Sequence, residues 1–472
     1  MRYEPTYESV HSHPLPAWYE DAKFGIFIHW SLFSVPAFAG EQHQDISESF
    51  QSGSADLWRN YPYAEWYLNS LRIPGSVTQE FHKKHYGSRS YESFQEDFEE
   101  QNADFDVSDW VKLIRAAGAK YAVLVTKHHD GYNLWPTVNP NPRRPGYHSK
   151  RDFVGEFCDA ADRAGIRAGL YYSGVFDWTF RTDVPIDGAA GYMRHQDMPA
   201  EYVDYAVRQL KELIDRYRPA VLWNDIAFPH GYDVNELFAY YYNRVEDGVV
   251  DDRWMQYLVP RTAAEWEAFE ESMKGKFFPP PPKERFHYDF VTAEYQELTG
   301  GRREKWECTR GIGRSFGFNR TEAGLDYLTG KQIIDLLVRV VAQNGNLLLN
   351  IGPRADGSVC QEQIKPLLET GAWLKTNGEA IYGTRPHDPV MCTDQNGNPV
   401  YFTEKGNTVY AIFLGEEPAP QMKLAGYRIP EGRCVTLCGV GPVSYTVKGA
   451  DTVLKFPETC GRQPAYVFRV EK

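Results

Sequence analysis

The chain has 472 residues, and its 51 Lys and Arg against 64 Asp and Glu give a net charge of −13. That length allows two or three domains, or one large barrel with an accessory module. A hydrophobic content of 42% with 24% charged residues excludes wholesale disorder. No apolar run reaches the roughly 20 residues of a membrane span, so we expect no membrane partner. The acidic balance, without any Lys/Arg run, argues against nucleic acid as a partner.

Residues 1–24 contain acidic side chains and lack the apolar core of a secretory signal. The seven cysteines are scattered and include no CxxC pair. Both features predict reduced thiols and a cytoplasmic protein. Aromatic residues reach 15% of the chain. This share favours a carbohydrate-binding protein, in which aromatic faces pack on sugars, although a large core filled with aromatic residues explains it equally well.

Five short and uniformly apolar runs predict strands that are buried on both faces, as in a parallel sheet. They are Phe24–Trp30, Tyr121–Lys127, Arg167–Ser173, Ala220–Asp225 and Asn346–Gly352. Helical patterns with expected caps at Ser108 and Asp152 accompany them: Val107–Ala117, Phe153–Ala164, Tyr202–Tyr217, Glu236–Asn243, Lys331–Ala342 and Gln361–Asn377. This alternation predicts an α/β fold of the (β/α)8, or TIM-barrel, type. A doubly wound sheet is the alternative, but no GxGxxG follows a strand.

The pattern changes after Tyr382. Residues 384–472 hold short alternating runs with Gly, Pro and Asn-Gly turns, which predict an antiparallel β-sandwich. We therefore predict two domains, a barrel over residues 1–383 and the sandwich over residues 384–472. Two long polar segments, Ala39–Asn60 and Met255–Arg285, interrupt the barrel region, and four consecutive prolines in the second exclude regular structure there. Segments of this length carry function or are disordered.

Polar side chains end four of the predicted strands, where (β/α)8 barrels carry their catalytic groups. They are His29, His128 and His129, Tyr171 and Tyr172, and Trp223 and Asp225. Any one alone is more simply a capping or hydrogen-bonding residue, but four strands that end this way together predict a site. Neighbours on a strand point to opposite sides, so we expect that His128 and His129 do not share a metal. We expect no metal and no organic cofactor.

Asp225 follows an apolar strand and lies beside a tryptophan, where its carboxylate would be partly desolvated. It could attack the anomeric carbon of a sugar or hold a cation, and capping the next helix is an equally good interpretation. Cleavage of a glycoside also needs a protonated carboxyl group. Glu65, Glu294 and Glu307 are candidates because aromatic residues flank them. Spacing does not choose among the three, since residues of distant strands converge in a barrel.

Eight stretches, in a fixed order from Trp18 to Tyr382, carry the strongest signal in the chain. They read WYEDAKFGIFIHW, YAEWYLNSLRIPGS, DWVKLIRAAGAKYAVLVTKHHDGYNLWP, GLYYSGVFDW, LWND, DFVTAEY, KWECTRGIGRSFGFNR and NGNLLLNIGPRADG. Together they resemble the α-L-fucosidases of glycoside hydrolase family 29. The resemblance implies retaining hydrolysis of terminal α-L-fucose from oligosaccharides or glycoconjugates, by double displacement through a covalent fucosyl-enzyme. It implies a barrel for the catalytic domain and requires no cofactor.

The resemblance also implies roles for individual residues. Asp225, in LWND, matches the nucleophile, and Glu294, in TAEY, matches the acid/base, with Glu307 as the alternative. Retention then implies carboxyl groups roughly 5–5.5 Å apart. Nine further residues match positions that contact the sugar: His29, Glu65, Trp66, His128, His129, Tyr171, Trp223, Arg253 and Phe316. Trp223 and Phe316 are expected to form the apolar wall that the C6 methyl group of fucose requires, and Arg253 matches less closely because the sequence after it departs from the pattern.

That departure is the segment Met255–Arg285, which is longer than the connection expected of close relatives. We expect it to overhang the leaving-group side of the site or to form a subunit contact, and whether the chain is a homo-oligomer is left open. Two other functions stay open. One is another retaining exo-glycosidase or a transfucosidase on the same barrel. The other is a catalytically silent fucose-binding protein, against which the presence of Asp225 and all three glutamates argues.

Overall fold

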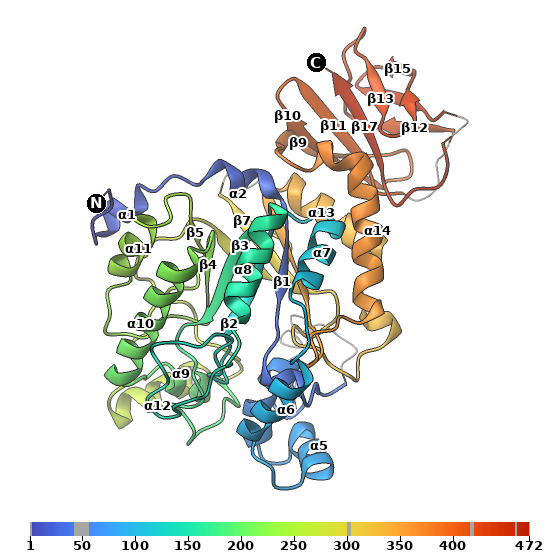
Figure 1. Cartoon of the computed structure of the whole chain (residues 1–472). Coiled ribbons are helices and arrows are strands. Elements are labelled where there is room, and N and C mark those ends of the chain that lie inside the picture. Colours follow the sequence, from blue (N-terminus) through green and yellow to red (C-terminus); the bar gives the residue numbers. More distant parts are fainter. Residues whose placement is uncertain (1, 42–55, 300–303, 416–419, 458–459, 472) are drawn as a thin grey trace.

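Eight parallel strands form one sheet in the computed structural model, which describes residues 2–41, 56–299, 304–415, 420–457 and 460–471 (Figure 1). The strands are β1 (Phe24–Ile28), β2 (Tyr121–Lys127), β3 (Arg167–Ser173), β4 (Val221–Asp225), β5 (Val249–Val250), β6 (Val291–Glu294), β7 (Trp306–Gly311) and β8 (Gly345–Ile351). Their order in the sheet is β5-β4-β3-β2-β1-β8-β7-β6, so β8 returns beside β1. This confirms the predicted (β/α)8-type arrangement. Most of the predicted segment Ala39–Asn60 lies outside the described residues.

The edge strands β5 and β6 meet through a backbone hydrogen bond and the side chains of Asp289 and Asp252 and not, within the described residues, through a paired ladder. The Asp289 N–H donates to the Val250 carbonyl at 2.9 Å, and the Asp289 carboxylate accepts from the Val250 N–H at 2.8 Å. Asp252 accepts from the backbone N–H and the hydroxyl of Thr292 at 2.9 and 2.7 Å. The long segment Met255–Arg285 therefore leaves and re-enters the barrel at its weakest seam.

Helices surround the sheet. Those that the sequence predicts are α7 (Ser108–Ala117), α8 (Phe153–Ala164), α10 (Ala200–Tyr217), α11 (Val234–Tyr242), α13 (Gly330–Ala342) and α14 (Gln361–Asn377). The others are α1 (Tyr7–His11), α2 (Ala17–Ala22), α4 (Tyr67–Arg72), α5 (Val77–Tyr86), α6 (Phe94–Gln101), α9 (Ala189–His195) and α12 (Ala263–Ser272). Asp152 caps α8 as predicted, since its carboxylate accepts from the Gly155 N–H at 2.8 Å. The prediction for Ser108 is wrong, because Val107 holds the cap position of α7.

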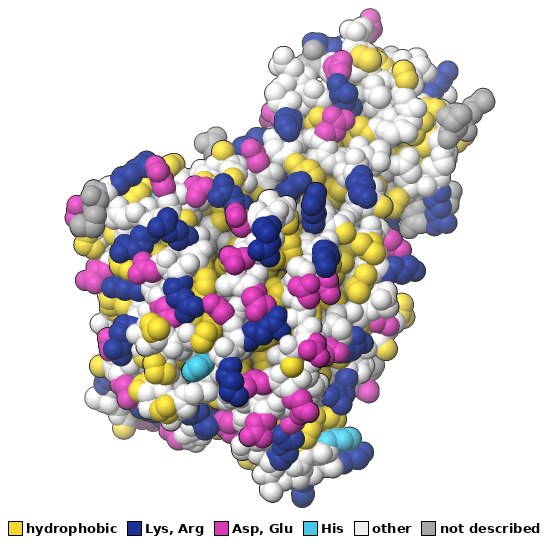
Figure 2. All heavy atoms as spheres, in the orientation of Figure 1, with side chains coloured by type: hydrophobic (Ala, Val, Ile, Leu, Met, Phe, Trp, Pro, Cys, Tyr) yellow, Lys and Arg dark blue, Asp and Glu magenta, His cyan; other side chains and the backbone are white. Residues whose placement is uncertain are grey.

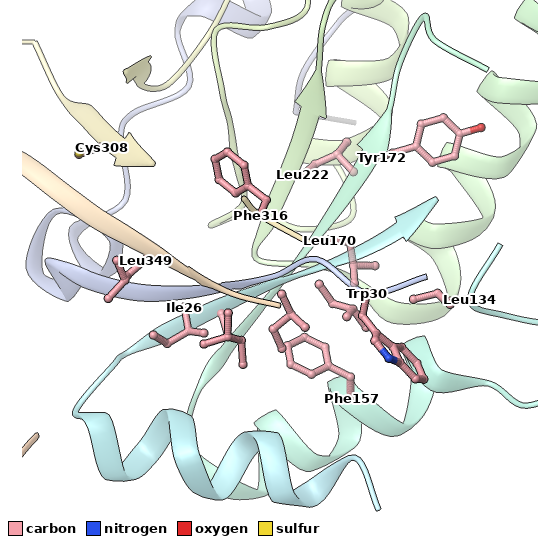
Figure 3. Close-up of a cluster of buried hydrophobic side chains, with 14 of the residues drawn as sticks. Ile26, Trp30, Leu134, Phe157, Leu170, Tyr172, Leu222, Cys308, Phe316 and Leu349 are labelled. Atoms are coloured by element: carbon pink, nitrogen blue, oxygen red, sulfur yellow. The ribbon is translucent and has the colours of Figure 1, made fainter. Parts of the chain in front are cut away.

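Alternation along the strands sends side chains either outward to the helices or inward to the barrel axis. Outward-facing Ile26, Leu170 and Leu222 pack in the core together with Phe157 of α8 (Figure 3). Inward-facing residues fill the barrel, among them Tyr121, Val123, Val125, Val221, Trp223 and Leu348. The same alternation turns the side chains at the carboxyl ends of β1, β3 and β4 inward, so that they meet over the barrel axis.

The sequence analysis did not identify β5, β6 or β7. β5 has only two residues, which is too short for a pattern. β7 reads WECTRG, and its inward positions Glu307 and Thr309 interrupt the apolar run although both are buried. The search for uniformly apolar runs fails here because polar side chains inside the barrel find hydrogen-bond partners there.

Two antiparallel sheets follow α14 in the described residues, and no helix lies in their region, as predicted. The six-stranded sheet has the order β14-β13-β17-β11-β10-β9, and the three-stranded sheet has the order β12-β16-β15. Their strands are β9 (Arg385–Thr393), β10 (Pro399–Lys405), β11 (Thr408–Phe413), β12 (Gln421–Leu424), β13 (Val435–Leu437), β14 (Gly441–Pro442), β15 (Tyr445–Lys448), β16 (Asp451–Lys455) and β17 (Tyr466–Glu471). β9 begins just after the predicted boundary at residue 383, and the division into two domains stays a prediction.

The larger of these sheets is buried on both faces at its centre. Val409, Ala411 and Phe413 of β11 belong to the core between the two sheets, whereas Tyr410 and Ile412 belong to the core shared with the barrel. Figure 1 places β9–β17 beside α13 and α14, at the opposite end of the molecule from α9 and α12. Figure 2 shows Lys and Arg side chains interspersed with Asp and Glu on the face of the molecule that is turned to the viewer. Among the described helices, none is long and apolar enough to cross a membrane.

Candidate active site

A cavity of about 760 Å³ lies at the carboxyl ends of the barrel strands, within the size range of small-molecule sites. Its lining includes all eleven residues to which the resemblance assigns roles, namely Asp225, Glu294, His29, Glu65, Trp66, His128, His129, Tyr171, Trp223, Arg253 and Phe316. They come from six strand ends and from the loops that follow. The structure therefore brings the whole predicted set together, while the role of each residue stays a prediction.

Asp225, the last residue of β4, is buried to 9% exposure at the wall of the cavity. Its Oδ2 accepts from the Tyr171 hydroxyl at 2.8 Å, and its Oδ1 accepts from Arg253 Nη1 at 2.7 Å. Burial alone would raise the pKa of this carboxyl, but Arg253, His129 and the Tyr171 hydroxyl together hold the pKa below its ordinary value. Asp225 is therefore ionised at neutral pH, as a nucleophile must be.

One guanidinium joins the two predicted catalytic carboxylates. Arg253 Nη1 lies 2.7 Å from Asp225 Oδ1, and Arg253 Nη2 lies 3.2 Å from Glu294 Oε2. The Tyr63 hydroxyl donates to the other oxygen, Glu294 Oε1, at 2.7 Å. The Arg253 guanidinium also lies 4.9 Å from the centroid of the Trp223 ring. Burial alone would lower the pKa of Arg253, but Asp225 and Glu294 raise it, so this cation stays charged and fixes both carboxylates.

Two buried histidines present hydrogen-bond acceptors to the cavity. The Asn350 amide donates to a backbone carbonyl at 2.7 Å, so its Oδ1 accepts from His29 Nδ1 at 2.7 Å. The Ser173 hydroxyl also donates to a backbone carbonyl, at 2.6 Å, and accepts from His129 Nδ1 at 2.7 Å. Burial lowers the pKa of His29 to about 4 and that of His129 to about 3, so both rings are neutral at neutral pH. Each Nε2 is then free of a proton and suits a sugar hydroxyl.

His128 and His129 do not point to opposite sides, so the orientation that we expected from strand alternation is wrong. Both line the cavity, and their ring centroids are 4.0 Å apart. The reason is that β2 ends at Lys127 and that its register with β3 shifts after Val125, so the alternation does not continue through the pair. Within the described residues, no group of three or more His, Cys, Asp or Glu side chains is arranged to hold a metal ion.

Glu65 lies in the short 3-10 helix η2 (Ala64–Trp66) and is 2% exposed. Its Oε2 accepts from the Gly317 N–H at 2.8 Å and from the Ser315 hydroxyl at 3.1 Å. Burial raises the pKa of Glu65 to about 7 in spite of these hydrogen bonds. This carboxyl group can therefore either donate to or accept from a sugar hydroxyl near neutral pH.

The stability of the protein should depend on pH through Glu65. Because its pKa is about 7 in the fold against 4.5 ordinarily, the folded state binds the proton more tightly. The stabilisation is complete below pH 4.5 and is lost as the pH rises through about 7. Glu65→Gln cannot ionise, so between about pH 5 and about pH 8 its free energy of unfolding should fall by about 2.5 kcal/mol less than that of the wild type. Denaturant unfolding at both pH values measures this, and an identical pH dependence of the two proteins would contradict it.

Glu307 does not line the cavity. It is fully buried deeper in the barrel, where its Oε2 accepts from the hydroxyls of Tyr19 and Tyr121 at 2.8 and 2.5 Å. Its Oε1 accepts from Trp223 Nε1 at 3.0 Å. Burial raises the pKa of this carboxyl group above its ordinary value. Tyr121 is the first residue of β2, so Glu307 lies toward the amino end of the barrel, and it supports Trp223 from below without access to a substrate.

Tyr171 and Tyr172 face opposite sides of β3. Tyr171 points into the cavity and donates to Asp225. Tyr172 points outward, as Figure 3 shows, donates to the Gln209 side chain at 2.9 Å and has Lys127 Nζ 4.3 Å from its ring centroid. Tyr172, which the strand-end pattern grouped with the site, is therefore a core residue.

This pair offers a matched test of the contact to Asp225. Tyr171→Phe removes one hydrogen bond to a buried carboxylate and should lower kcat/KM by roughly 10- to 100-fold. Since this hydroxyl helps to lower the pKa of Asp225, the acidic limb of the pH–rate profile should move to higher pH. Tyr172→Phe loses an equivalent hydroxyl outside the cavity and should change kcat/KM by less than about threefold. Equal losses in the two variants, with no shift of the acidic limb, would contradict the assignment.

The sequence analysis missed several aromatic residues of the cavity. Tyr61, Tyr63, Tyr192, Tyr257 and Phe278 all belong to its lining. Tyr63 was within reach, because it begins the YAEWY stretch that flanks Glu65. The others lie in loops and in α9, where no strand pattern marks a side chain as directed to the barrel axis.

A pair of carboxyl groups in one cavity at the carboxyl end of a barrel is the arrangement with which glycoside hydrolases cleave their substrates, and the neutral histidines and aromatic walls suit a sugar. Residues 1–379 match the family model described as Alpha-L-fucosidase. The chain belongs to the α-L-fucosidase family and is a glycoside hydrolase.

Similar proteins cover most of the chain. It is 33% identical to the tissue α-L-fucosidase of Homo sapiens over 424 residues, which are 88% of this chain and 78% of that protein. It is 33% identical to an α-L-fucosidase of Dictyostelium discoideum over 82% of this chain and 75% of that protein. Among solved structures, a Thermotoga maritima α-fucosidase in complex with a mechanism-based inhibitor superposes with a TM-score of 0.83 at 37% identity, over 100% of both chains.

Proposed function

We propose that this protein hydrolyses terminal α-L-fucosyl residues of oligosaccharides or glycoconjugates with retention of configuration. Asp225 serves as the nucleophile and Glu294 as the acid/base. The observation that carries the proposal is the contact of both carboxylates with Arg253 inside one cavity, at 2.7 and 3.2 Å. A structure of the Thermotoga maritima α-fucosidase in complex with fucose, 37% identical and with a TM-score of 0.82 over 99% of this chain and 100% of that one, adds support.

In the first step a carboxylate oxygen of Asp225 attacks the anomeric carbon, and the bond from that carbon to the leaving oxygen breaks. Glu294 gives its proton to the leaving oxygen, so the aglycone departs as a neutral alcohol. Positive charge develops on the sugar ring in the transition state, and ionised Asp225 stabilises it. The product of this step is a fucosyl ester of Asp225.

In the second step Glu294 takes a proton from water, the water oxygen attacks the anomeric carbon, and the ester bond to Asp225 breaks. Two inversions at this carbon give net retention. Formation of the ester removes the charge of Asp225, while Arg253 keeps its contact with Glu294, the base of this step.

The part of the cavity lined by His29, His129, Glu65, Trp223 and Phe316 suits a neutral deoxy sugar. His29 and His129 accept from hydroxyl groups through Nε2, and Glu65 adds a carboxyl group that can donate or accept. Phe316 and Trp223 line the same cavity and supply the apolar surface for the C6 methyl group. Such a site prefers fucose to a hexose with a C6 hydroxyl, whose burial on an apolar wall would leave it without a partner.

Time-resolved proton NMR of the protein with an aryl α-L-fucoside tests the proposal. We expect α-L-fucose to appear first and the β anomer to follow by mutarotation. Early β-L-fucose would mean inversion and would overturn the role of Asp225. Absence of turnover in a folded protein that binds fucose would mean a silent binding protein, and turnover of other glycosides alone would mean a different exo-glycosidase.

A further inference from the structure

The connection Met255–Arg285 reaches the cavity of the active site. Met255, Tyr257, Phe278 and Pro281 of this connection belong to the lining of the cavity. Resting on the proposed function, we propose that the connection builds a subsite for the leaving group, which binds a pyranose ring by stacking on Phe278. The subsite is formed by Phe278, Tyr257, Tyr192 and Tyr61, and we refer to it as the aromatic subsite.

The connection is anchored to the barrel. The sequence predicted no regular structure around its prolines, and residues 279–288 have none, but α12 forms before them with a capping box of Thr262 and Glu265. The Trp266 ring of α12 has Arg194 of α9 4.2 Å from its centroid. Arg261 forms an ion pair of 2.7 Å with Asp197, just after α9. These contacts hold the connection against α9, which carries Tyr192.

Aromatic contacts link the connection to the rest of the cavity wall. The Phe278 ring lies 5.3 Å from that of Tyr192 and 5.9 Å from that of Trp58. The Tyr192 and Tyr257 rings are 6.1 Å apart. Trp58 in turn stacks on Tyr61 at 5.3 Å with an interplanar angle of 4°. Ring contacts therefore connect Phe278 with Tyr61 through Trp58, which is not itself part of the lining, and Phe278, which is half-buried while the others are buried, is the most accessible ring of the wall.

This wall borders both predicted catalytic carboxylates. Tyr61 packs against Tyr63 at 5.6 Å, and Tyr63 donates to Glu294. On the other side, the Tyr192 hydroxyl donates to the carbonyl of Ile226, the residue after Asp225, at 3.3 Å. The leaving group must lie on the Glu294 side of the anomeric carbon, because Glu294 protonates its oxygen. A sugar attached to that oxygen would therefore contact the aromatic subsite.

The chemistry of the subsite fits a pyranose. The cavity lining provides His29, His129 and Glu65 as hydroxyl-binding groups, whereas the aromatic subsite offers ring faces and the Tyr hydroxyls. The C–H face of a pyranose packs on an aromatic ring while its equatorial hydroxyls reach the rim. The cavity volume of about 760 Å³ lies in the upper part of the range for small-molecule sites, which leaves room beyond a single fucosyl ring.

The test compares a substrate that fills the subsite with one that does not. α-L-Fucosyl fluoride has a single atom as its leaving group, and the comparison substrate is the best cleaved of the (1→2), (1→3), (1→4) and (1→6) α-L-fucosyl-D-galactose disaccharides. In Phe278→Ala, the ratio of kcat/KM for the disaccharide to that for the fluoride should fall about 5- to 10-fold. Phe278→Tyr keeps the ring and should retain the wild-type ratio. The matched control is Phe277→Ala, which removes the neighbouring ring outside the cavity lining and should also retain it.

The outcomes separate this proposal from the proposed function. If the wild type hydrolyses neither the fluoride nor the disaccharides, the proposed function fails. If it hydrolyses both and the ratio is unchanged in Phe278→Ala, or falls equally in Phe277→Ala, the subsite proposal is wrong. A fall for a nitrophenyl fucoside but not for the disaccharide would mean an aryl site and would also overturn the pyranose assignment. If Phe278→Ala does not fold, the wild type, Phe278→Tyr and Tyr257→Phe are compared for transfer of fucose from the fluoride to methyl β-D-galactoside. No transfer to this acceptor by the wild type would overturn the proposal.

Discussion

Asp225→Gly is expected to lower kcat on aryl fucosides by about 10⁴-fold or more, because it removes the carboxylate to which we assign ester formation. The space that the side chain leaves admits a small anion to the same face of the sugar. With an aryl α-L-fucoside and sodium azide, azide should attack the anomeric carbon, displace the aryloxide and give β-L-fucosyl azide. Turnover measured with and without azide, with the product identified by NMR, checks both expectations.

The fold should tolerate this substitution, since Arg253 retains its contact with Glu294. Asp252→Asn is the matched control, because Asp252 lines the same cavity but its carboxylate is committed to the backbone and hydroxyl of Thr292. Its kcat should fall by less than about tenfold, without azide rescue. Ordinary turnover by Asp225→Gly, or azide rescue of Asp252→Asn in its place, would remove Asp225 from the role of nucleophile.

Glu294→Ala is expected to act according to the leaving group. A fucosyl disaccharide needs its leaving oxygen protonated, so its kcat/KM should fall by about 10²- to 10⁴-fold. A dinitrophenyl fucoside has a leaving group that departs as a stable anion, and its kcat/KM should fall by less than about tenfold. The second step also needs a base, so the fucosyl-enzyme should accumulate with the activated substrate and appear as a burst of dinitrophenolate.

Glu307→Gln provides the comparison for this series. Its carboxyl group lies beneath Trp223 and has no contact with the cavity, so the substitution should lower stability and affect all leaving groups alike. A plot of kcat/KM against the pKa of the leaving group separates the two cases. A steep slope for Glu307→Gln with a flat one for Glu294→Ala would reassign the acid/base to Glu307.

The sequence predicted the barrel well where strands are uniformly apolar. β2 and β3 begin and end at the predicted residues. The strand-end residues with predicted site roles at β1, β3 and β4 all line the cavity, namely His29, Tyr171, Trp223 and Asp225. It failed for β7, because Glu307 and Thr309 point into the barrel and break the apolar pattern. It also failed for His128 and His129, because a register shift in β2 cannot be read from residue types.

For the site, the motifs of the resemblance identified residues that periodicity and spacing alone could not rank. Local sequence left Asp225 open between cap and nucleophile, and spacing did not distinguish Glu294 from Glu307. The structure distinguishes these two by depth: Glu294 ends β6 at the cavity, whereas Glu307 is near the start of β7. The aromatic subsite was beyond prediction, because Phe278 and Tyr192 meet only after the connection folds back onto α9.

Trapping the ester is the most direct test of the claim that Asp225 forms a covalent fucosyl ester. The wild type is incubated with 2-deoxy-2-fluoro-α-L-fucosyl fluoride, then digested and analysed by mass spectrometry. The fluorine at C2 slows both steps, while the fluoride leaving group at C1 keeps the first step accessible. We expect one added 2-deoxy-2-fluorofucosyl group, located on Asp225 within the VLWND stretch and absent from Asp225→Gly. A label on another residue, or full turnover of aryl fucosides by a protein that never carries the label, would contradict the account.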